Sequence, residues 1–199
     1  MALCASAFIH FGPAHLLLNM WVLYLVGPPL EIAVGKMRFL ALYLFSILGG
    51  STFVLFWETL PGTQLALTAG ASGAIFGLFG ALIVLQRQLQ QDIRAMVTLV
   101  VINFAWGFVQ PGISWQGHFG GLLAGVVYAV VVLLLTPRLR AVAKRRKAVS
   151  SGLPYSEIRT SVFDQPAVLT TLQVVLTLVL GAGLYLLNLS LIYFVGLPS

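Results

Sequence analysis

The chain has 199 residues, of which 59% are hydrophobic and only 8% are charged, and its mean hydropathy is +0.99. A soluble domain of this length has too little interior to bury that much apolar surface, so the composition excludes a soluble protein and indicates an integral membrane protein of about six spans. The net charge of +6 would suggest a nucleic-acid partner only in a soluble protein; here we expect the lipid bilayer and no nucleic acid.

Six apolar segments follow one another along the chain, and we expect each of them to form a transmembrane helix. They cover residues 13–34, 37–57, 70–86, 95–110, 117–136 and 167–195. The sequence therefore predicts an all-α fold, a polytopic bundle of transmembrane helices. Its expected parts are a core at 1–136, a basic cytoplasmic linker at 137–166 and an additional C-terminal helix at 167–199.

The basic residues predict the orientation of the bundle. If the spans alternate in direction, all eleven lysine and arginine residues fall on one side, and the loops at 58–69 and 110–116 on the other side contain none. Basic loops remain cytoplasmic, so the starts of the third and fifth spans are expected to face the outside. The absence of targeting sequences suits a bacterial plasma membrane.

Polar side chains interrupt three of the apolar spans. Ser72 lies in Gly70-Ala71-Ser72-Gly73 where the third helix is expected to begin, His15 and Asn19 are one turn apart on the first, and His118 starts the fifth. Taken singly, each of these is more often a packing residue than part of a site. All of them, however, are expected near the external end of their spans, and this coincidence of depth indicates a site.

These residue types suggest acyl-transfer chemistry. Ser72 lies beside the unpaired N–H groups of a first helical turn, and a neutral His118 is a suitable base to take its proton. No acidic residue is placed to orient the imidazole, so a dyad is expected rather than a triad. The Asn19 amide, His15 and the Ser72 backbone N–H are candidate oxyanion donors. Cys4 is the only cysteine and nothing marks a metal site, so we expect no metal and no cofactor.

The combined motifs resemble those of the rhomboid family of intramembrane serine proteases. They are His15-x-x-x-Asn19, Gly70-x-Ser72-Gly73 and Gly117-His118-x-x-Gly121, in this order on successive alternate spans. The resemblance covers about residues 8–136 and implies that the expected core at 1–136 is a protease core.

The resemblance implies a role for each matching residue. Ser72 and His118 would be the catalytic dyad, and His15 and Asn19 would line the oxyanion hole. Phe76 matches an aromatic position that packs against the catalytic histidine. The supporting glycines are Gly70, Gly73 and Gly121. The substrates implied are membrane-anchored proteins, cut at or near their transmembrane segments without a metal.

The family core has six spans, one of them ahead of the His-x-x-x-Asn helix, whereas only five of the spans expected here belong to the core. Only fourteen residues precede His15. We therefore expect the native reading frame to begin upstream and to encode a further apolar segment of about 20 residues. The segment at 167–195 resembles the extra C-terminal helix that some members carry.

Two other functions fit parts of the pattern. A non-catalytic relative that binds and escorts membrane proteins would resemble the protease but lack the dyad, whereas Ser72 and His118 are both present. A small transporter or channel would use His15, Asn19 and His118 as a polar pathway. It would spread polar residues along the membrane depth, whereas here they gather near one side.

Overall fold

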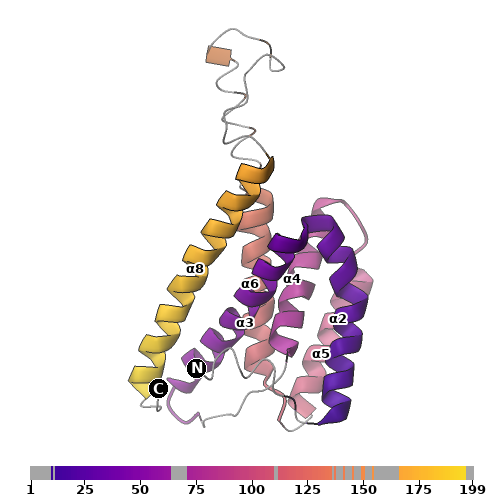
Figure 1. Ribbon diagram of the computed structural model, residues 1–199. Helices are drawn as coiled ribbons and strands as arrows, with labels where there is room; N and C mark the ends of the chain where they lie inside the picture. The colour runs from indigo at the N-terminus through magenta and orange to yellow at the C-terminus, as the bar shows by residue number, and fades with distance from the viewer. Residues whose placement is uncertain are drawn as a thin grey trace.

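The computed structural model describes residue 10 and residues 12–63, 71–109, 112–135 and 166–195, together with a few single positions between 137 and 154. The ribbon is a bundle of helices without strands in these parts (Figure 1). Its elements are α2 (Pro13–Val34), α3 (Lys36–Glu58), α4 (Ser72–Gln88), α5 (Arg94–Val109), α6 (Trp115–Tyr128), the π-helix η2 (Ala129–Leu135) that continues α6, and α8 (Pro166–Val195). The predicted all-α bundle is confirmed.

Not every helix is long enough to cross a bilayer by itself. Among the described residues, four helical segments are long and apolar enough: Pro13–Val34, Lys36–Glu58, Trp115–Leu134 and Gln173–Val195. The helices α4 and α5 have only 17 and 16 residues. A helix of that length extends about 25 Å, which is less than the ~30 Å hydrocarbon layer. Neither of these two helices therefore spans the hydrocarbon layer by its own length.

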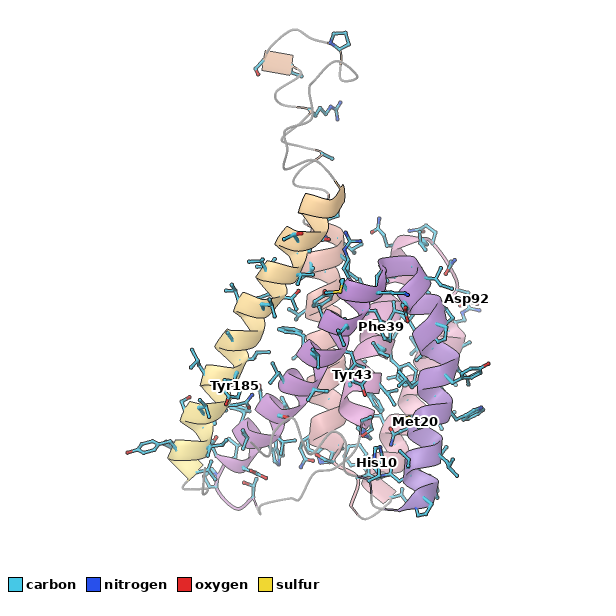
Figure 2. All side chains as sticks on the ribbon, viewed as in Figure 1. His10, Met20, Phe39, Tyr43, Asp92 and Tyr185 are labelled. Carbon is cyan, nitrogen blue, oxygen red and sulfur yellow. The ribbon has the colours of Figure 1, made fainter. Side chains whose placement is uncertain are left out.

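Successive helices alternate in direction, so the starts of α2, α4 and α6 lie together at one end of the bundle (Figure 1). The opposite end carries the described basic residues of the core, which are Lys36, Arg38, Arg87 and Arg94. Figure 2 shows the same separation, with His10 at the end where α2 begins and Asp92 at the basic end. The basic residues of the core and the predicted site residues thus occupy opposite ends.

A single residue, Gly35, joins α2 to α3. Its φ of +87° lies in the left-handed region, which glycine adopts without a steric penalty. In this conformation the Gly35 N–H donates to the Glu31 carbonyl at 2.7 Å, and the Gly35 carbonyl accepts from the Phe39 N–H at 2.9 Å. The chain therefore reverses in one residue while its backbone groups stay paired.

The helix α4 lies at the centre of the bundle and contacts α2, α3, α5 and α6 (Figure 1). All residues from 74 to 81 are buried, so this part of α4 has no face toward lipid. A helix that is apolar all round belongs in such an enclosed position. The enclosure fixes the first turn of α4, where Ser72 lies, relative to the surrounding helices.

Glycines let the backbones of α4 and α6 touch. A methyl group added at Gly121 would overlap the carbonyl oxygen of Gly73, and one added at Gly125 would overlap that of Gly77. Small residues at a helix contact allow such close approach in membranes. Because Ser72 adjoins Gly73 and His118 lies one turn before Gly121, the contact sets the distance between their two helices.

We predict that Gly121→Ala destabilises the protein. The added methyl group meets backbone atoms of Gly73, which cannot rotate away as a side chain can, so α4 and α6 must separate at a cost of about 1–3 kcal/mol. Thermal unfolding of the purified protein in detergent measures the effect. Gly183→Ala on α8 is the matched control, because no atom lies within 4 Å of its added methyl group. Equal unfolding temperatures for the two variants would contradict the proposed contact.

The C-terminal helix α8 packs along α3 and is held there by hydrogen bonds at two depths. Near the basic end, Gln173 accepts from the Arg38 guanidinium at 2.6 Å and donates to the Val132 carbonyl at 2.6 Å. Near the other end, the Asn188 amide donates to the Thr52 hydroxyl at 3.1 Å. Polar contacts of this kind fix the register of α8 against the core.

Candidate active site

Ser72 is the first residue of α4 and follows the buried Ala71. The first N–H groups of a helix have no partner within it, so the backbone around Ser72 presents donors and the positive end of the helix dipole. The Ser72 side chain is only partly buried. A hydroxyl in this position is accessible and is surrounded by groups that favour a developing negative charge.

His118 is placed by the start of α6. The Ser114 hydroxyl caps this helix by accepting from the Gly117 N–H at 3.1 Å, and the Ser114 carbonyl accepts from the His118 N–H at 3.2 Å. The cap fixes where α6 begins, and so places His118 in its first turn. The imidazole is only 5% exposed.

Aromatic stacking sets the plane of the His118 ring. The ring of Phe76 lies parallel to it, with centroids 4.2 Å apart and an interplanar angle of 11°. Phe76 lies one turn after Ser72 on α4 and also contacts Phe104 of α5, with centroids 6.1 Å apart. The stacking leaves the edge of the imidazole, which carries its nitrogens, as the part that can react.

One cavity of about 90 Å³ brings together all four residues proposed for the chemistry. Ser72, His118, His15 and Asn19 lie on its wall, which also includes Leu18, Val22, Ile75, Phe76, Phe79, Asn103, Trp106 and Ile113. These side chains come from α2, α4 and α5, from the start of α6 and from the residues just before it. Residues more than a hundred positions apart in sequence thus share one small space.

The sequence predicted three supporting glycines for the site, Gly70, Gly73 and Gly121. Gly73 and Gly121 lie at the contact between α4 and α6 and are not part of the cavity wall. Gly70 lies outside the described residues.

Hydrogen bonds occupy some groups of the cavity and leave others unpaired. The Asn19 amide, 6% exposed, donates one N–H to the His15 carbonyl at 2.9 Å. The His15 ring lies edge-on to the ring of His10, with centroids 5.3 Å apart. Among the described residues, neither ring nitrogen of His118 has a hydrogen-bond partner. The imidazole is therefore held by stacking and burial, with both nitrogens available.

The profile of the Rhomboid domain matches residues 1–135, which is more than half of the chain. The chain belongs to the rhomboid family. The match covers α2 to η2 and the cavity between them, and it leaves α8 outside the rhomboid domain.

Several curated relatives are similar to this chain. The chain is 35% identical over 142 residues to the rhomboid protease GluP of Bacillus subtilis (strain 168), which covers 69% of this chain and 26% of the relative. It is 34% identical to RHOMBOID-like protein 5 of Arabidopsis thaliana, covering 66% and 44% of the two chains. It is 25% identical to the rhomboid protease AarA of Providencia stuartii, covering 68% and 57%. The matched part thus spans between 26% and 57% of the length of these relatives. No solved structure matches the chain significantly.

The cavity of this rhomboid domain includes residues that the sequence did not place in the site. Asn103 and Trp106 of α5 and Ile113 before α6 lie on its wall. For Asn103 a signal exists, because an amide within an apolar segment of a membrane protein indicates a functional or hydrogen-bonded position. Trp106 and Ile113 are apolar residues in an apolar region, so their place on the wall follows only from the packing of α5 and the start of α6.

Proposed function

We propose that this rhomboid protein is an intramembrane serine protease with Ser72 as nucleophile and His118 as general base. The proposal is carried by one observation: the two side chains line the same cavity from the first turns of adjacent helices. The backbone contacts of Gly73 with Gly121 and of Gly77 with Gly125 hold those helices together. A fixed nucleophile and base are the requirement for this reaction class.

In the proposed mechanism, the Ser72 hydroxyl attacks the carbonyl carbon of a peptide bond while His118 takes its proton. The resulting imidazolium then gives the proton to the leaving amine, which departs with one half of the substrate. The other half remains as an ester on Ser72. A water molecule, activated by the same imidazole, hydrolyses the ester and restores both groups.

The tetrahedral intermediate carries an oxyanion, and the cavity offers donors for it. The first-turn N–H groups of α4 around Ser72 have no partner within the helix. Asn19 has a second amide N–H besides the one bonded to the His15 carbonyl, and the partly buried His15 lines the same wall. Donors that are already in place stabilise the charge as it develops.

The short length of α4 supports the proposal that the substrate is cut within the membrane. Arg87 near its end favours the headgroup region, and Ser72 lies about 22 Å away along the helix, so it falls several ångströms short of the far side of the ~30 Å hydrocarbon layer. We therefore propose that the substrates are membrane-anchored proteins, cut at or near their transmembrane segments.

Cleavage in liposomes tests the proposal. The purified protein is reconstituted with a single-span fusion protein, and mass spectrometry locates any cut. We expect a cut at or near the transmembrane segment and none in a soluble unfolded protein such as casein. Cleavage of casein alone, or of neither protein, would contradict the proposed substrate class.

We also propose that the basic end faces the cytoplasm and the cavity end faces outside, because basic loops are retained in the cytoplasm. The test uses the exposed Leu60, after α3, and the exposed Gln91, between α4 and α5. With Cys4→Ser as background, Leu60→Cys is expected to react with an impermeant maleimide added to intact cells, and Gln91→Cys is expected to react only after the cells are opened. The reverse pattern would overturn the orientation.

A further inference from the structure

One nitrogen of the His118 ring faces α5. A methyl group added at Gly107 of α5 would lie 3.4 Å from Nδ1 and 3.7 Å from Cε1 of His118. Both ring nitrogens are buried, and neither is hydrogen-bonded to a described residue. If His118 accepts the Ser72 proton through Nε2, its neutral form carries a hydrogen on Nδ1. That buried N–H then needs an acceptor on the α5 side, since an unpaired buried donor is unfavourable.

Asn103 presents an acceptor on this side of the cavity. It lies one turn before Gly107, so the two residues share a face of α5, and its side chain lines the cavity together with His118. Its amide donates to the Leu99 carbonyl at 2.8 Å. Because a carbonyl can only accept, the atom facing Leu99 is the amide nitrogen, so the side-chain oxygen of Asn103 is not used in this bond.

Among the described residues of the cavity wall, no carboxylate competes with Asn103 to accept the Nδ1 hydrogen of His118. The cavity wall contains no Asp or Glu from any of its described helices, and its other titratable group is His15 of α2, with the His10 ring beside it. Asn19 also carries an amide oxygen, but it belongs to α2, whereas Nδ1 faces α5. The volume of about 90 Å³ exceeds the roughly 10–15 Å³ that a cavity needs to hold one water.

We propose that Asn103 is a positioning residue of the proposed protease: its side-chain oxygen, through one water in the cavity, accepts the Nδ1 hydrogen of His118. This bond keeps Nε2 unprotonated and directed away from α5, toward Ser72, and it stabilises the imidazolium that forms during attack. Asparagine then supplies the orienting group that an aspartate supplies in a Ser-His-Asp triad. Asn103 acts through His118 and does not itself touch the reacting atoms.

Two isosteric variants distinguish this role from a structural one. Asn103→Leu keeps the shape and removes the acceptor, whereas Asn103→Asp keeps the shape and the acceptor. A merely structural residue in an apolar helix would tolerate leucine and suffer from a carboxylate. The positioning role predicts the opposite order: Asn103→Leu lowers kcat by at least about tenfold at nearly unchanged KM, and Asn103→Asp retains most of the activity.

The kinetics are measured in liposomes with the transmembrane substrate. Asn103→Ala repeats the loss of the acceptor without added bulk, so the test does not depend on how well the leucine variant folds. The control is Ile102→Leu, which changes a lipid-exposed neighbour on α5 and is expected to leave kcat unchanged. Wild-type kcat in the leucine and alanine variants, or an equal loss in the aspartate variant, would overturn the inference. The inference rests on the proposed function. Cleavage that survives Ser72→Ala in the same assay would contradict the proposed function itself.

Discussion

Ser72→Ala and His118→Ala are each expected to lower cleavage to background, with kcat reduced by up to about 10⁶-fold. Without the hydroxyl no ester can form. Without the imidazole, which is 5% exposed and stacked on Phe76, the cavity loses its proposed general base. The measurement is the rate of substrate cleavage in liposomes by each purified variant.

The double variant is expected to be no worse than either single variant, because nucleophile and base act as one unit. Ser46→Ala is the matched control, since Ser46 is a fully buried serine of α3 whose hydroxyl only donates to the Leu42 carbonyl at 2.8 Å. It should cleave at nearly the wild-type rate. Losses that multiply in the double variant would mean that Ser72 and His118 act separately.

Asn19→Ala is expected to lower kcat by about 10²- to 10³-fold and to change KM little, because an oxyanion donor acts mainly in the transition state. The side chain is nearly buried on the cavity wall, and one of its amide hydrogens remains after the bond to the His15 carbonyl. Residual activity should persist, since the first-turn N–H groups of α4 are unaffected.

The matched control for this variant is Asn188→Ala. Asn188 is a fully buried asparagine of α8 that donates to Thr52, outside the cavity wall. Its removal is expected to lower the unfolding temperature and to leave kcat close to wild type. If Asn19→Ala turned over at the full rate, Asn19 would not belong to the oxyanion hole.

Local sequence signals were sufficient to locate the helices. The expected segment at 13–34 coincides with α2, and the expected start of a helix beside Ser72 coincides with the start of α4. Apolar runs bounded by glycine, proline and charged residues predict membrane helices well, because a bilayer leaves the backbone few alternatives. The alternation of direction, on which the assignment of the basic residues to one side depended, is present in the bundle (Figure 1).

The site could be predicted only in part. His15, Asn19, Ser72 and His118 were predicted to lie together because each is near the same end of its span, and the rhomboid motifs predicted the same set. The place of Asn103 could not be predicted in this way, because it lies in the interior of α5. Among the described residues of this helix only Val100 and Gly107 are buried, so its sequence carries little information on which side faces the core. The rotation of α5 about its own axis is set by packing, with Gly107 beside His118 and Phe104 beside Phe76.

The most direct test of the proposed dyad is to find which residue a fluorophosphonate modifies, because this reagent reacts with activated serine hydroxyls independently of any substrate. The protein is treated in detergent and digested, and mass spectrometry identifies the modified peptide. We expect a single adduct on Ser72 in the wild type and in Ser46→Ala, and none in His118→Ala. An adduct on another serine, or equal labelling of Ser72 without His118, would contradict the claim that His118 activates Ser72.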